Sequence, residues 1–245
     1  RSLNELSVLS VRFHLLQQLN RAVVQAVRYV NLSQGDLPWS IAGMLSSCRQ
    51  LIFLPLKEEL WQAELARTAR PLPPPAGTGR IRPILELRLS RGRASRHARP
   101  RGPLAGLEQR HTLFGQAFLA LKNAPAEAFR LRPGEALYST VFLGEHAHDA
   151  GGPYRESFAE YCAELQSGAL PVLIRCPNAV SDVGINREKW LPNPAVGREG
   201  SSAALHGEML LFLGRLMGVA IRSQQPLDLD MPSIVWKQLV RSPIT

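Results

Sequence analysis

Cysteine is scarce in this chain, and its scarcity excludes one class of protein. The 245 residues include three cysteines, an odd number at irregular spacing. The sequence therefore has no disulfide framework of the kind that holds small secreted domains together. Because unpaired thiols suit a reducing compartment, we expect a cytoplasmic protein, with the nucleus as a second candidate location.

Long apolar runs are also missing. The most apolar window, residues 209–221, is shorter than a membrane span and is interrupted by Arg215, so we expect no membrane span. No signal-peptide pattern is present. The first residue is Arg1 rather than Met, which leads us to expect that the chain is part of a longer protein.

Acidic residues are outnumbered, giving a net charge of +9. The excess is concentrated between residues 80 and 101, where one acidic residue, Glu86, faces eight arginines: Arg80, Arg82, Arg88, Arg91, Arg93, Arg96, Arg99 and Arg101. Such a segment can hold phosphates. It supports an alternative function, a non-catalytic helical scaffold whose basic loop binds acidic proteins or nucleic acid. However, residues 91–103 lack aromatic side chains for base stacking and are rich in Gly, Pro and Ser, which predicts a solvated loop and disfavours nucleic acid as a partner.

Recognisable metal-ligand spacing is absent as well. His146, His148 and Asp149 have side chains that could bind zinc, but no fourth ligand follows at a typical distance. Arg155 and Glu156 could be taken for an acid/base pair, although charged residues in a first helical turn more often form surface pairs. We predict no metal, no cofactor and no catalytic residue in this chain.

The first 70 residues carry helical periodicity. The pattern predicts one long helix over residues 6–30 that needs a partner surface, and at least one more helix over residues 41–69, with Pro55 in a break or a first turn. Residues 71–79 are rich in Pro and Gly and are typical of a linker. The apolar residues expected to pack are Val8, Val11, Leu15, Leu19, Val23, Val27 and Val30 in the first helix, and Leu51, Leu54, Trp61 and Leu65 after it.

Residues 141–156 predict a strand, a turn and the start of a helix. The sequence V-F-L is β-prone and ends at Gly144, and Asp149 or Gly152 can cap the helix that Pro153 begins. We expect Gly151 or Gly152 to adopt a positive φ in this turn. The helix then presents one apolar stripe and stops at Gly168. The stripe consists of Phe158, Tyr161, Cys162 and Leu165.

The remaining residues predict a short β-hairpin followed by two helices. Residues 171–176 and 189–191 are strand candidates joined by a polar loop, and Pro192 is expected to stop the second strand. A helix capped by Ser201 or Ser202 follows. In that helix Gly214 and Gly218 predict close approach of another backbone. In the last helix, residues 234–240, Trp236 is expected to anchor the core.

Several motifs resemble one family. The string G-E-x-x-x-D-A-G-G-P-x-R-E from Gly144 to Glu156 resembles the opening of the HECT domain, the ubiquitin-protein ligase module, although Ala147 stands where many members have glycine. Four further segments match in order and spacing: L-F-G-Q-A-F-L-A-L, N-R-E-K-W-L-P-N-P, F-L-G-R-L-M-G-V-A-I-R and I-V-W-K-Q-L. Residues 82–93 also resemble the strand-like segment that leads into HECT domains. The motifs are similar to those of HECT ligases that are very large proteins with RCC1-like repeats.

This resemblance implies a mainly α fold with a minor β component. Residues 1–70 would form an upstream helical segment, residues 71–110 a linker and lead-in strand, and residues 111–245 part of a HECT N-lobe. The conjugating-enzyme dock and the cysteine-bearing C-lobe would follow beyond Thr245. The implied partners of the whole protein are a ubiquitin-conjugating enzyme, ubiquitin and protein substrates. The motif residues, expected to be structural, are Gly144, Glu145, Asp149, Gly151, Gly152, Pro153, Arg155, Glu156 and Trp236.

The cysteines present do not suit catalysis. A nucleophilic thiol needs an accessible position and a lowered pKa. Cys162 is on an apolar helix face, Cys48 is in an apolar segment, and Cys176 is next to Pro177. We expect all three to be ordinary packing residues and this chain alone to be inactive.

Overall fold

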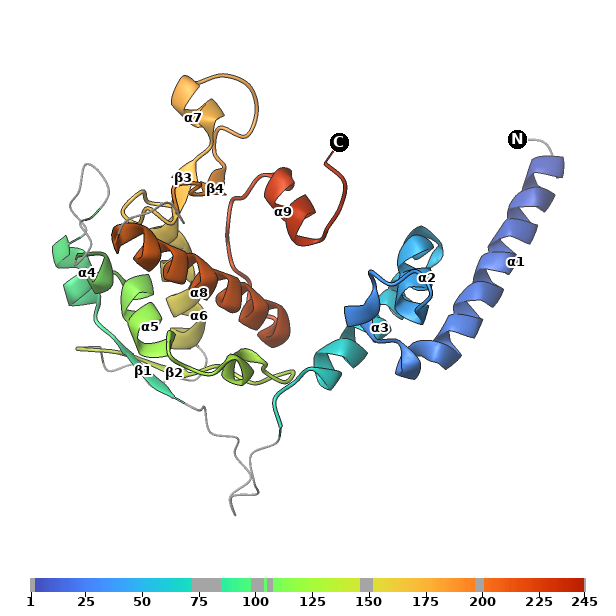
Figure 1. Ribbon diagram of the computed structural model, residues 1–245, viewed down its shortest axis with the longest axis horizontal. Helices are drawn as coiled ribbons and strands as arrows, with labels where there is room; N and C mark the ends of the chain where they lie inside the picture. The colour runs from blue at the N-terminus through green and yellow to red at the C-terminus, as the bar shows by residue number, and fades with distance from the viewer. Residues whose placement is uncertain are drawn as a thin grey trace, which may run out of the picture. The chain divides into compact units, whose positions relative to one another are not determined.

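The protein is described by a computed structural model covering residues 3–71, 85–97, 104, 108–145, 152–196 and 201–244. The chain divides into two compact units, Arg1–Ala69 and Arg70–Thr245. Helices dominate both, and the strands form two small two-stranded sheets. The predicted fold class, mainly α with a minor β component, is confirmed (Figure 1).

The first unit is helical. It contains α1 (Leu3–Ala26), η1 (Val27–Tyr29), η2 (Leu32–Gln34), α2 (Ile41–Ser47), η3 (Arg49–Leu51) and α3 (Leu54–Arg67). Ser40 caps α2 through its side chain, and Pro55 occupies the first turn of α3, as predicted. The small core consists of Val23, Val27, Val30, Ala42, Ile52, Leu56 and Leu60.

Part of the predicted packing in this unit is wrong. Leu65 is buried, but Leu51, Leu54 and Trp61 are exposed. In α1 the stripe is buried only at its C-terminal end, and Val8, Val11 and Leu15 are about half exposed or more. Periodicity identified the helix correctly, but it could not show that α2 and α3 are too short to cover the whole stripe.

The second unit begins with a parallel strand pair. Strand β1 (Glu86–Leu89) pairs with β2 (Ser139–Phe142), with Glu86 opposite Ser139 and Leu89 opposite Phe142. The other sheet is the predicted hairpin, an antiparallel pair of β3 (Leu173–Arg175) and β4 (Trp190–Pro192). Pro192 is the last residue of β4 rather than the residue after it. A two-stranded sheet tolerates a proline in a strand because both of its strands are edge strands. The loop between them contains a short helix, α7 (Pro177–Ser181).

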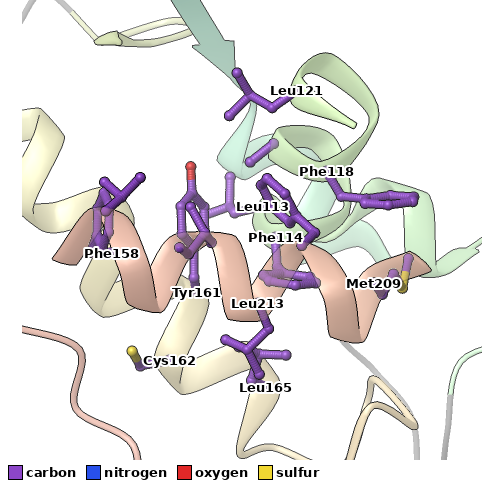
Figure 2. Packing of buried hydrophobic residues seen from close by; sticks show 14 of the residues in the cluster. Leu113, Phe114, Phe118, Leu121, Phe158, Tyr161, Cys162, Leu165, Met209 and Leu213 are labelled. Carbon is purple, nitrogen blue, oxygen red and sulfur yellow. The ribbon is translucent and has the colours of Figure 1, made fainter. Parts of the chain in front are cut away.

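Three helices form the core of this unit. They are α5 (Leu113–Leu121), α6 (Gly152–Leu165) and α8 (Ser201–Ser223). Figure 2 shows side chains from all three helices meeting, and the ring of Phe114 contacts that of Tyr161 edge to face. The ring centroids of Phe114 and Phe212 lie 5.5 Å apart. The remaining elements are α4 (Arg91–His97), η4 (Glu108–His111), η5 (Ala126–Phe129) and α9 (Ser233–Leu239).

Helix α8 is longer than the apolar window in the sequence suggested. In the described part of the chain, one helical segment is long and apolar enough to cross a membrane by length and composition alone. This segment is Ala204–Ser223, within α8. A single helix of this kind is weak evidence for a span, because core helices pass the same test. Met209, Phe212 and Leu216 are fully buried in the helical core, which explains the apolar residues on that face of α8.

Two expectations about this region are wrong. A Cβ atom added to Gly214 or Gly218 would meet no atom within 4 Å, so these glycines do not face a closely packed backbone. Trp236 is 40% exposed and donates a hydrogen bond from Nε1 to the Met231 carbonyl rather than anchoring the core. The core face of α8 lies instead along Met209, Phe212, Leu213, Leu216 and Val219.

Candidate functional site around Arg91

The parallel pairing of β1 and β2 brings two distant segments together. The carboxyl ends of parallel strands lie at the same edge of a sheet, so the residues that follow β1 and β2 become neighbours. Arg91 begins α4 just after β1, and Glu145 follows the turn after β2. Gly144 makes that turn with a φ of 89°, a conformation that favours glycine.

Arg91 lies between carboxylates from two segments. Its Nη1 donates to both oxygens of Glu145, at 2.9 and 2.7 Å. Its Nη2 is ion-paired with Glu156, and its Nε lies 3.5 Å from Glu160. The guanidinium also lies 3.9 Å from the centre of the Phe142 ring, a cation–π contact. Arg91 thus connects α4, the β2 turn and α6.

The cluster is acidic overall. Three carboxylates surround one guanidinium, and the Arg91 side chain is 28% exposed. Burial works against the charged form of Arg91, but hydrogen bonds with Glu145 and Glu156 outweigh it, so the Arg91 pKa is raised. Arg91 stays charged, and the surplus negative charge is at the surface.

Glu164 lies two turns after Glu156 on α6, and its carboxylate contacts backbone N–H groups rather than Arg91. Its two carboxylate oxygens accept hydrogen bonds at 2.7 Å from the backbone N–H groups of Leu113 and Phe114, so it caps α5. Burial raises the Glu164 pKa to about 7, while the two backbone hydrogen bonds lower it and the charge of Glu160 raises it. The carboxylate is stabilised by the helix terminus but costs free energy to bury.

A cavity of about 500 Å³ adjoins these carboxylates. Its walls include Arg91, Glu160 and Glu164, together with Thr112 and Ser167. Among the described residues that line it there is no cysteine and no histidine. Its described walls offer charge and hydroxyl groups but no strong nucleophile and no general base of the usual Ser–His or Cys–His type.

Comparison with known proteins decides what this chain is related to. It is 37% identical over 163 residues to E3 ubiquitin-protein ligase HERC2 of Mus musculus and of Homo sapiens, covering 66% of this chain and 3% of each relative. It is 30% identical over 251 residues to the probable E3 ubiquitin-protein ligase HECTD4 of Homo sapiens, covering 96% of this chain and 6% of that protein.

The chain is related to a segment of HECT-type E3 ubiquitin-protein ligases. The resemblance inferred from the ordered motifs is thereby confirmed. No protein-family model matches the chain. The chain spans a few per cent of the length of these relatives.

The HECT-like motif supplies structural contacts at the positions that the structure describes. Gly144 makes the turn after β2, Glu145 and Glu156 bind Arg91, and Pro153 is buried in the first turn of α6. A positive φ was expected at Gly151 or Gly152, and it is not found at Gly152, which is the first residue of α6. The positive φ described in this region is at Gly144, in the turn after β2. Arg155 is exposed. Asp149 and Gly151 lie outside the described residues.

The solvated loop predicted for residues 91–103 is also wrong where the structure describes it. Arg91–His97 is a helix, and Arg91 is committed to the carboxylates. Arg88 forms an exposed ion pair with Glu86, with Nε 2.7 Å from Oε1. These contacts weaken the basis for the nucleic-acid alternative. Arg80, Arg82, Arg99 and Arg101 lie outside the described residues.

None of the three thiols resembles a catalytic cysteine. Cys162 is 3% exposed, and burial raises its pKa to about 11. Burial also raises the pKa of Cys176. Cys48 packs against the small core of the first unit. Because reactivity requires an accessible thiolate, these thiols fit packing roles.

Sequence reasoning missed Arg91, Glu160 and Glu164. A signal for the carboxylates was present, since Glu156, Glu160 and Glu164 recur every four residues and therefore share one face of α6. Among the described residues, no group of three or more His, Cys, Asp or Glu side chains is placed to hold a metal. The candidates His146, His148 and Asp149 are outside that set.

Proposed function

We propose that this chain belongs to the N-lobe region of a HECT-type ligase. The complete ligase accepts ubiquitin from a conjugating enzyme as a cysteine thioester and transfers it to lysines of protein substrates. The observation that carries the proposal is the similarity to HERC2 and HECTD4 together with the ordered motifs. The chain's own residues provide a framework for that reaction.

The Arg91 cluster supports the framework role. It joins α4, the turn after β2, and α6, and the Glu164 cap joins α6 to α5. These contacts fix the ends of the core helices without presenting a nucleophile. A conjugating enzyme, ubiquitin and substrates are the proposed partners of the complete protein. The cytoplasm is the proposed location, with the nucleus as the alternative, which the three free cysteines suit.

Thioester trapping tests the part of the proposal that concerns this chain. The chain is incubated with activating enzyme, a panel of conjugating enzymes and ubiquitin, and the products are separated with and without reductant. We expect no reducible ubiquitin adduct on this chain, because burial raises the pKa of Cys162 and of Cys176, and Cys48 packs against the small core of the first unit. A reducible adduct that disappears in Cys48→Ser, Cys162→Ser or Cys176→Ser would overturn the framework role.

A further inference from the structure

Four arginines of the second unit gather where η5 and the residues after it meet α8. Arg215 and Arg222 are seven residues apart on α8, so they lie on the same side of that helix, about two turns from each other. Beside α8, Phe129 and Leu131 are buried, and the two arginines that alternate with them are exposed or half-buried. These four residues form the arginine strip: Arg130, Arg132, Arg215 and Arg222.

Contacts with the chain after η5 bring the two arginines of α8 into the strip. The guanidinium carbon of Arg215 lies 5.2 Å from the centre of the Phe129 ring. Nη1 of Arg222 donates to the Leu131 carbonyl at 3.2 Å. Phe129 and Leu131 are the neighbours of Arg130 in the chain, so both guanidiniums of α8 contact residues next to Arg130.

The strip keeps its positive charge because its donors are bound by neutral acceptors. Arg215 donates from Nη1 to the Lys122 carbonyl at 3.3 Å. Arg132 donates from Nε and Nη2 to the Arg70 carbonyl at 3.1 and 2.8 Å. Among the described residues, the guanidiniums of Arg130, Arg132 and Arg215 form no ion pair. A carbonyl oxygen orients a guanidinium without cancelling its charge, so these contacts preorganise the strip.

The segments that carry the strip, residues 126–135 and α8, contain three acidic residues. Two of these have basic partners: Glu135 is buried with Oε2 2.8 Å from Nη2 of Arg70, and Oε2 of Glu208 lies 3.4 Å from Nζ of Lys122. The third, Glu127, is exposed in η5. The strip therefore has an excess of positive charge at the surface, which attracts an anionic partner.

This chain as a whole does not supply the opposite charge. Residues 1–69 include seven basic and five acidic residues, and the net charge of the chain is +9. Neither the first unit nor a second copy is therefore an anion overall. Nucleic acid is also a poor match, because the aromatic residues of the two segments, Phe129 and Phe212, are buried and offer no ring for base stacking. Glu127 and Glu208 would in addition repel a continuous row of phosphates.

We propose that the arginine strip binds an acidic segment of a partner protein. Guanidinium groups bind carboxylates through paired hydrogen bonds, and a guanidinium has five N–H donors, so Arg132 and Arg215 keep donors for a ligand beyond their carbonyl contacts. Arg215 and Arg222 are about 10 Å apart along α8, which is the length of about three residues of extended chain. Asp or Glu side chains about three positions apart in the partner would reach both.

The binding should depend strongly on salt. Ion pairs at a surface are weak one by one and are screened by salt, so we expect affinity to come from several pairs together and to fall as ionic strength rises. The inference does not depend on the proposed ligase function, because peptide binding is measured without ubiquitin transfer.

Fluorescence anisotropy of the full chain with a labelled peptide of ten glutamates tests the proposal at about 50 mM salt. We expect saturable binding that weakens at least about tenfold when Arg130→Gln and Arg215→Gln are combined. The matched control combines Arg88→Gln with Arg187→Gln. It removes the same charge from exposed arginines that already have acidic partners, and should weaken binding less than about twofold. All four side chains are exposed, so melting temperatures should stay close to wild type.

Two further probes with the same label separate the classes of partner. One is a neutral peptide of alternating glycine and serine, and the other is a single-stranded DNA of ten thymidines. We expect no binding of the neutral peptide and weaker binding of the DNA than of the glutamate peptide. No binding of the glutamate peptide, equal losses in the two double variants, or tighter binding of the DNA would overturn the proposal.

Discussion

Arg91 and Glu145 lie 54 residues apart in sequence, yet Nη1 of Arg91 donates to both carboxylate oxygens of Glu145. The contact closes the edge where β1 and β2 end side by side. Glu145 belongs to the HECT-like motif, whereas Arg91 lies in the arginine-rich segment that composition alone assigns to solvent. Part of the chain's positive charge is therefore used inside the fold.

Replacing Arg91 should destabilise the second unit. Arg91→Gln leaves three carboxylates without their cation, and we expect a cost of about 1–2 kcal/mol after allowing for solvent screening of the partly exposed acids. Arg93→Gln is the matched control, since Arg93 is exposed two residues later on α4, and should change stability little. Denaturant unfolding measures both. Equal stability for the two variants would show that the cluster contributes nothing.

Removing one carboxylate should have a smaller effect than removing the arginine. Glu156 is 52% exposed and shares Arg91 with Glu145 and Glu160. Glu156→Gln relieves repulsion among the acids while two partners remain, so we expect a change within about 0.5 kcal/mol of wild type. A loss as large as that of Arg91→Gln would mean that Glu156 is the essential partner.

Glu164 should give the second unit a characteristic pH dependence. Its folded pKa of about 7 lies above the unfolded value of about 4.3, so the folded state keeps a proton that the unfolded state releases. Stability from this group is fully present below about pH 4 and is lost as pH rises through about 7, by on the order of 3–4 kcal/mol.

The Glu164→Gln variant isolates that contribution. Gln accepts one of the two backbone N–H groups of α5 but cannot ionise, so its deficit relative to wild type should be largest near pH 5 and smaller near pH 8. Glu208→Gln, at an exposed acid on α8, is the control. Unfolding free energies measured across this range should show the difference; parallel curves for Glu164→Gln and wild type would contradict the assignment.

The turn after β2 should depend on Gly144 rather than on Gly152. Gly144→Val places a β-branched residue at a φ of 89° and should cost about 1–3 kcal/mol. Gly152→Ala, at the start of α6 with no atom within 4 Å of the added Cβ, should be neutral or slightly stabilising. If Gly152→Ala lowered the unfolding midpoint more than Gly144→Val did, the result would favour the turn at Gly151 or Gly152 that was inferred from the sequence.

Local patterns predicted much of the fold. The residues of α5 are apolar almost throughout, and the helix coincides with the segment L-F-G-Q-A-F-L-A-L that resembles the HECT family. The stripe Phe158, Tyr161, Cys162 and Leu165 is buried, and Gly168 has a φ of 80° beyond the end of α6. These features depend on periodicity and capping within a few residues, which a sequence displays directly.

Contacts between distant residues could not be predicted in this way. The parallel pairing of β1 with β2 joins segments about 50 residues apart, and it alone gives Arg91 its partners. Trp236 and Gly214 were assigned to packed positions from residue type, but their environment depends on which face of the helix meets the core. The Arg91 cluster therefore required the structure, although the four-residue spacing of its α6 carboxylates was visible in the sequence.

The most direct test of the central claim is thioester formation by a chimaeric ligase. The segment of human HERC2 that aligns with this chain is replaced by the corresponding residues of this chain, and the ubiquitin thioester is trapped on a non-reducing gel. The account predicts that the chimaera forms a reducible thioester, and that adding Arg91→Gln weakens it while adding Arg93→Gln does not. A chimaera that unfolds cooperatively but carries no thioester would contradict the assignment of this chain to the framework of a HECT-type ligase.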